Sequence, residues 1–113
     1  MATYTTATLV RNRIENLDAS ITDTMIDGYI EEAEQILNAI MGVSFIATFN
    51  ATKHGLLRAG CNAWAAMCAV TFNPAGFTNL AEANAMLEVL AYQWEQVIAY
   101  VRDKSVVEYL ESL

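Results

Sequence analysis

Apolar side chains recur along much of the chain at the three- and four-residue spacing of one helix face. The clearest stretch is 23–41, where a single stripe contains Ile26, Ile30, Ala33, Leu37 and Ile40. This spacing predicts an amphipathic α-helix. Thr22 or Asp23 precedes the stretch as a cap, and Gly42 follows it directly, as expected for a left-handed helix end.

The same pattern predicts three further helices, at 6–16, 52–72 and 79–103. Threonines precede the first one and can cap it. The stretch 52–72 is apolar almost all round, which is typical of a helix buried in a core. The helix at 79–103 begins with Asn79 and Glu82, which have the spacing of a capping box.

Two short stretches complete the chain. Residues 43–50 are rich in β-branched and aromatic side chains, but a single strand would have no partner, so we expect a packed connector. In the last nine residues, Ser105 and Glu108 again have capping-box spacing, which predicts a short extra helix. The expected fold is therefore all-α: a four-helix bundle-like domain over 1–104 and a C-terminal contact segment over 105–113.

Composition narrows the functional classes. The 113 residues are 55% hydrophobic and 17% charged, with a net charge of −7. A chain this apolar folds, and its acidic balance argues against a general nucleic-acid binder. Between Gln35 and Ala81 there is no acid, and only Lys53 and Arg58 are charged. This third of the chain must be buried, either in its own core or against other copies or a partner.

Nothing in the sequence indicates a membrane protein. The longest purely apolar run, 63–70, is far shorter than the ~20 residues of a transmembrane helix. The first residues lack the basic and apolar regions of a secretory signal. We therefore expect a protein without membrane contact that is made in the cytoplasm.

His54, Cys61 and Cys68 follow one another at seven-residue intervals, and their side chains are of the types that bind metal ions. On one helix such neighbours are about 10.5 Å apart, too far to share an ion or to form a disulfide. The same separation keeps the only histidine from activating either thiol. We expect buried free thiols, no metal, no cofactor and no enzymatic activity.

Charged and aromatic residues provide the candidate contacts. Arg11 and Arg13 either pair with Glu15 or Asp18, or contact an acidic neighbour or a DNA backbone. Trp64, opposite Trp94, is either a core residue or a ligand platform. Two phenylalanines near the Asn73-Pro74 turn, Phe72 and Phe77, are further candidate contacts. The apolar side chains of the tail either dock on the chain itself or contact a partner: Val106, Val107, Tyr109 and Leu110.

A further surface is acidic. Asp23, Asp27, Glu31 and Glu34 share one arc of the helix at 23–41. They form either a solvated face opposite the apolar stripe or an acidic docking surface. Like charges four residues apart cost only a few tenths of a kcal/mol, so the solvated face needs no functional reason.

The run 21–36 (ITDTMIDGYIEEAEQI) resembles the pattern D-x-x-(I/L)-x-x-x-I-x-x-A-x-x-x-I of small head–tail connector (adaptor) proteins of tailed bacteriophages. The order of elements over about residues 4–70 is also similar: a short helix, a capped long helix, a connector and an alanine-rich helix. The resemblance implies a structural virion protein of the neck. It implies a homo-oligomeric ring, commonly of twelve copies, that lies beneath the portal protein, extends the DNA channel without sequence-specific binding and docks the next tail component.

Two physical features agree with that resemblance. A charge-free middle suits a subunit that packs against copies of itself, and a negative charge would keep a channel wall from gripping DNA. The alternative is a small helical protein-binding or regulatory module that acts as a dimer, which the acidic face and the apolar tail favour. In either case we expect the tail to be mobile alone and ordered in an assembly.

Overall fold

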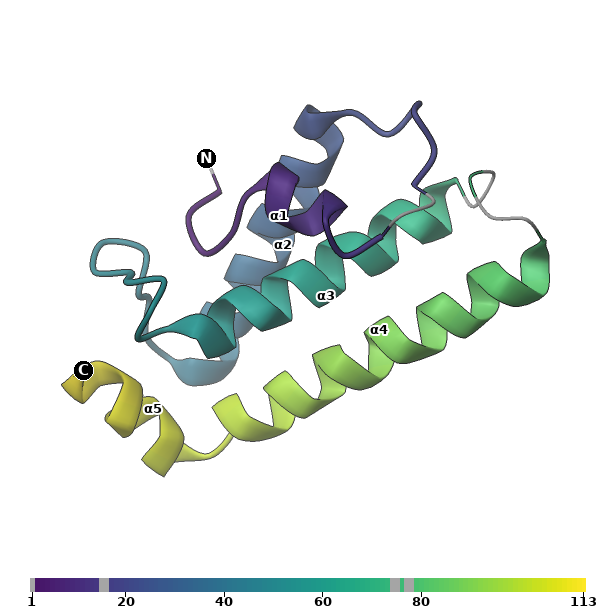
Figure 1. Ribbon diagram of the computed structural model, residues 1–113. Helices are drawn as coiled ribbons and strands as arrows, with labels where there is room; N and C mark the ends of the chain where they lie inside the picture. The colour runs from purple at the N-terminus through teal and green to yellow at the C-terminus, as the bar shows by residue number, and fades with distance from the viewer. Residues whose placement is uncertain (1, 15–16, 74–75, 77–78) are drawn as a thin grey trace.

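The computed structural model describes residues 2–14, 17–73, 76 and 79–113. Within these ranges all regular structure is helical, so the predicted all-α fold is confirmed (Figure 1). The helices are α1 (Ala7–Arg11), α2 (Asp23–Met41), α3 (Gly55–Phe72), α4 (Leu80–Val101) and α5 (Lys104–Ser112). Three of them are long, so the core is built by α2, α3 and α4, with α1 and α5 packed on it.

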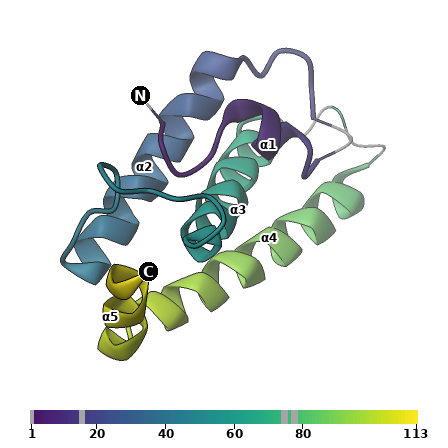
Figure 2. The same ribbon diagram turned by 60° about the vertical axis from the view of Figure 1, so that its left-hand side comes forward.

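The molecule is elongated, with extents of 44 × 25 × 21 Å. Helices α3 and α4 run side by side in opposite directions, and α2 crosses α3 on the side away from α4 (Figures 1 and 2). Helix α1 packs on α2 and α3, and α5 turns back from the end of α4. Helix α3 is thus the central element, which explains why it is apolar almost all round.

Helix α2 is bounded by the caps that the sequence predicts. The Thr22 hydroxyl accepts the Met25 N–H at 3.2 Å. At the other end Gly42 has φ +72° and donates its N–H to the Asn38 carbonyl at 2.9 Å. The predicted stripe faces the core, and four of its side chains are fully buried: Ile26, Ile30, Ala33 and Leu37.

Helix α3, at the centre of the charge-free stretch, is largely buried within the chain itself, whereas residues 46–48, 50–53 and 71–72 of the same stretch are exposed. Helix α3 has buried residues around its whole circumference, among them Leu57, Cys61 and Val70. Gly60 marks the closest approach of α3 and α4, because a Cβ placed there would lie 2.7 Å from Val97 Cγ1. For α3, the structure shows the first of the two alternatives, burial in the chain's own core, because α1, α2 and α4 pack on it.

Two helix ends differ from the prediction. Helix α1 stops at Arg11 rather than near Asn16, because the chain turns there, with the Arg13 N–H donating to the Val10 carbonyl at 3.0 Å. Helix α3 begins at Gly55 rather than near Thr52. The Asn50 side chain accepts the N–H groups of Thr52 and Lys53 at 3.0 and 3.1 Å, a local turn that competes with a helix start.

The C-terminal helix exists, but its cap is one that we did not predict. The Asp103 carboxylate accepts the Ser105 N–H at 2.9 Å, so α5 begins at Lys104 and the capping box at Ser105 is wrong. At the start of α4 the prediction is confirmed, since Asn79 accepts the Glu82 N–H at 2.8 Å. The segment 43–50 is a packed connector without a strand, in which Phe45 is buried.

Candidate functional site

The candidate contact residues do not form one site. Arg11 lies beside α2, where its Nε is 2.8 Å from an Asp23 carboxylate oxygen and its Nη2 donates to the Ile21 carbonyl at 2.6 Å. The pairing with Asp18 that we considered does not form. The Asp18 carboxylate instead accepts the Ser20 N–H at 2.8 Å, which lowers its pKa. Glu15, the other partner considered, lies outside the described residues, and Arg13 is exposed.

Trp64 and Trp94 meet where α3 and α4 pack. Their ring centroids are 5.0 Å apart at an interplanar angle of 45°, and both side chains are partly buried. The Trp64 Nε1 atom is buried, and no acceptor among the described residues reaches it. The pair contributes to helix packing, as expected for aromatic residues on facing apolar stripes.

The two ends of the long axis carry exposed aromatic residues. Phe72 is the last residue of α3 and is 61% exposed, and Leu80, the first residue of α4, is also exposed. Tyr109 on α5 is 59% exposed at the opposite end. Phe77 lies outside the described residues.

Most of the tail residues face their own chain. Val107 and Leu110 are buried, and Val106 is partly buried against the core. In this conformation Val107 and Leu110 are not available to a partner, and Tyr109 is the residue of the set that points to solvent.

His54 ties the tail to the connector. The ring is only 3% exposed; its Nδ1 accepts the Asn50 N–H at 3.0 Å, and its Nε2 lies 3.2 Å from the Leu110 carbonyl oxygen. Because Nδ1 accepts a backbone N–H, Nε2 is the nitrogen that donates to the Leu110 carbonyl. Both nitrogens are satisfied within the fold, which makes His54 a structural residue.

The two thiols are unsuited to nucleophilic or metal chemistry. Cys61 and Cys68 are free. Burial raises the pKa of Cys61, and burial raises the pKa of Cys68 to about 11. Thiols are reactive and bind metals as thiolates. In the described part of the chain no three His, Cys, Asp or Glu side chains are grouped so that they could hold a metal ion.

Buried polar side chains of α2 and α3 form a cradle of hydrogen bonds around the N-terminal segment, which the sequence pattern did not predict. The carboxylate of Glu34, 2% exposed, accepts the backbone N–H groups of Thr3 and Tyr4 at 2.6 and 2.7 Å. The Tyr4 hydroxyl donates to Asn38 Oδ1 at 2.6 Å and accepts the Phe45 N–H at 2.9 Å. Burial raises the pKa of Tyr4. The interpretation of Glu34 as part of a solvated acidic face is therefore wrong.

Two side chains of α3 complete this cradle. The Thr5 hydroxyl donates to Asn62 Oδ1, and Arg58 Nε donates to the Tyr4 carbonyl at 3.0 Å. The Arg58 guanidinium also lies 5.5 Å from the centre of the Phe49 ring. Helices α2 and α3 thus fix residues 3–5 by their backbone as well as by their side chains.

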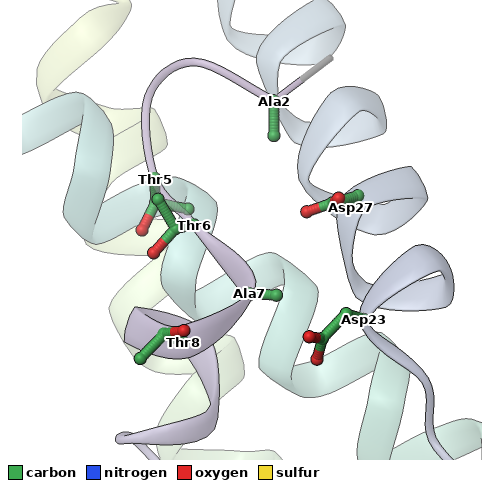
Figure 3. A pocket seen from close by; sticks show the side chains of 7 residues that line it. All are labelled: Ala2, Thr5, Thr6, Ala7, Thr8, Asp23 and Asp27. Atoms are coloured by element: carbon green, nitrogen blue, oxygen red, sulfur yellow. The ribbon is translucent and has the colours of Figure 1, made fainter.

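A pocket of about 270 Å³ lies between the N-terminal segment and the start of α2 (Figure 3). Its polar lining consists of threonine hydroxyls and the carboxylates of Asp23 and Asp27, which point from α2 toward the N-terminal segment. Asp23 is already paired with Arg11. The lining can accept hydrogen bonds from a small donor.

The outer face of α4 carries several exposed apolar side chains. Opposite its buried residues, the helix exposes Val89, Tyr92 and Tyr100, with Tyr92 62% exposed. Ala81, Ala85, Gln96 and Ala99 are exposed along the same face. The seven positions fall within an arc of about 100° when each residue advances about 100°. Contiguous exposed apolar surface of this kind marks an interaction site more often than scattered residues do.

Comparisons with protein-family models, with curated proteins and with solved structures gave no match. Within the described residues, no helix is both long and apolar enough to cross a membrane. The class that the structure defines is therefore a small all-α domain. Its exposed large apolar side chains include Phe72, Tyr109 and those on the outer face of α4.

Proposed function

We propose that the chain is a head–tail connector (adaptor) subunit of a tailed bacteriophage, a structural protein that forms a ring beneath the portal and docks the next tail component. The observation that carries this proposal is the placement of exposed aromatic residues at both ends of an elongated molecule. Phe72 is the last residue of α3 and Tyr109 belongs to α5, and the end of α3 and helix α5 lie toward opposite ends of the molecule (Figure 1). A subunit that bridges two different partners needs an apolar contact at each end.

The architecture supports the proposal in a second way. The residues that carry the resemblance in α2 include Ile26, Ile30 and Ala33, and these form the buried face of a helix capped at both ends. The elements occur in the expected order: a short helix, a capped long helix, a packed connector and an alanine-rich central helix. The wall of a DNA channel must also avoid gripping DNA, and a chain of net charge −7 suits that role.

The proposal is tested by mixing the purified chain with a purified phage portal protein and examining the mixture by negative-stain microscopy and native mass spectrometry. We expect rings of the chain attached to the portal. A wild-type chain that leaves the portal bare would contradict the proposal.

Phe72→Ser and Tyr109→Ser serve as each other's control. Each removes one exposed aromatic ring from one end and leaves the core untouched. We expect each variant to lose one partner, either the portal or the next tail component, and to retain the other. Two variants that retain both partners would show that the aromatic ends are not the contacts.

A further inference from the structure

Charged residues recur at regular intervals along one edge of the apolar stripe on the outer face of α4. Glu88, Glu95 and Arg102 follow one another at seven-residue intervals along one side of the stripe, and all three are exposed. Residues seven apart lie nearly above one another on a helix. The edge therefore reads acid, acid, base from the start of α4 to its end, beside the stripe that contains Val89, Tyr92 and Ala99.

This order of charges is complementary to the same edge of a second copy of α4 that runs in the opposite direction. In an antiparallel pair related by a two-fold axis, each edge meets the same edge of the partner. With the axis near Glu95, Glu88 of one copy lies opposite Arg102 of the other, and the reverse pair forms as well. Only Glu95 meets its own counterpart. Two attractive pairs against one repulsive pair favour this register.

The side chains of the stripe fit the same register. A two-fold axis beside Glu95 places Val89 opposite Ala99 of the other copy and Tyr92 opposite Gln96. A large side chain therefore faces a smaller one at each apolar level, which lets the two helices approach. A register shifted by one heptad toward the start of α4 would instead place Glu88 opposite Glu95 twice, which costs energy.

We infer that the outer face of α4 is a self-association surface on which a second copy of this chain docks antiparallel, with Glu88 of each copy paired with Arg102 of the other. With the axis near Glu95, residues 88–101 of the two α4 helices face each other, a contact about 21 Å long. A contact along one such helix face is at the small end of stable interfaces, so we expect a reversible dimer with a micromolar dissociation constant. The inference does not rest on the proposed function, because a two-fold contact closes on itself and a ring needs a second, different contact.

The test is sedimentation velocity and native mass spectrometry of the purified full chain without any partner, over micromolar to millimolar concentrations. We expect a monomer–dimer equilibrium. Glu88→Arg and Arg102→Glu should each raise the dissociation constant at least tenfold, because each variant makes both edge pairs repulsive. Glu32→Arg, the same charge reversal on an exposed residue of α2, should leave the equilibrium unchanged.

Mixing the two variants gives the decisive readout. A Glu88→Arg chain and an Arg102→Glu chain restore both pairs when they meet, so the mixture should form heterodimers of wild-type affinity while neither variant dimerises alone. A wild-type chain that stays monomeric, single variants that dimerise normally, or a mixture without heterodimers would each overturn the inference. Loss of portal binding by the wild-type chain, in contrast, would count against the proposed function only.

Discussion

The backbone N–H of Tyr4 donates to the buried carboxylate of Glu34 at 2.7 Å, across thirty residues of sequence. The same oxygen accepts the Thr3 N–H. A carboxylate in a nearly closed site is tolerated when it is hydrogen-bonded, and here it satisfies two donors that the extended N-terminal segment would otherwise leave unpaired. Glu34 therefore holds the start of the chain on α2.

Glu34→Ala removes the acceptor for both N–H groups. Each buried donor left unsatisfied costs about 1–3 kcal/mol, so we expect the free energy of unfolding to fall by about 2–6 kcal/mol in urea titrations. Glu32→Ala, an exposed neighbour on the same helix, should change stability by less than about 0.5 kcal/mol. Equal midpoints for the two variants would contradict the role assigned to Glu34.

The sequence predicted Glu34 to be solvated, but it is buried, because its burial depends on a segment far away in the sequence. The stripe of α2 and its caps depend on neighbours within a few residues, so periodicity predicts them. Glu34 lies roughly 70° from the centre of that stripe when each residue advances about 100°, a position that is solvated on an isolated helix. It is buried only because residues 3–5 pack over it, and no local pattern specifies that contact.

For the candidate contact residues too, the sequence predicts what depends on local pattern and misses what depends on contacts between distant segments. The exposure of Phe72 and Tyr109 agrees with contacts proposed from the sequence, whereas Val107 and Leu110 are buried against the chain itself. In the fold, α5 contacts His54, whose Nε2 lies 3.2 Å from the carbonyl oxygen of Leu110, 56 residues further along the chain. Residue pattern alone shows that the tail is apolar, but it does not show whether the tail packs on its own chain.

Gly60→Ala tests the close approach of α3 and α4. The added Cβ would lie 2.7 Å from Val97 Cγ1 and 3.3 Å from Val97 Cβ. Overpacking of this kind costs about 1–3 kcal/mol, more than the roughly 1 kcal/mol that alanine gains over glycine in a helix. We expect a lower midpoint of thermal unfolding, recovered in part by Val97→Ala in the same chain.

Gly28→Ala is the matched control for that substitution. Gly28 is also helical, but a Cβ there meets no atom within 4 Å. Because the higher helix propensity of alanine is then the main effect on stability, the variant should be more stable than the wild type by up to about 1 kcal/mol. If both glycine variants shifted the midpoint in the same direction, packing at Gly60 would not be the cause.

Burial of Cys68 predicts a dependence on alkaline pH. Because burial raises the pKa of Cys68 from 9.0 to about 11, the folded chain holds the thiol proton more tightly than the unfolded chain. The resulting stability is complete below pH 9 and is lost as the pH rises toward 11. Between these values the wild type should lose more stability than Cys68→Ala in urea titrations, and parallel curves would contradict the shift.

Alkylation rates provide a second measurement on the same thiols. Only the thiolate reacts with iodoacetamide at a useful rate, so both cysteines of the folded chain should react slowly at pH 8. Cys61 is more deeply buried than Cys68 and should react more slowly. Rapid modification of Cys61 in the folded chain would show that α3 is accessible, against the packing described.

His54→Ala should release α5 from the rest of the chain. The substitution removes the hydrogen bonds to Asn50 and Leu110 and the ring that lies 5.0 Å from Phe45. Helix α5 has only nine residues, too few for a stable isolated helix. We therefore expect faster hydrogen exchange at the amides of Val107 to Glu111, with protection in α2 and the middle of α3 preserved. Lys53→Ala, an exposed neighbour, should leave exchange in α5 unchanged. Unaltered protection of α5 in the His54 variant would mean that Val107 and Leu110 alone hold the helix in place.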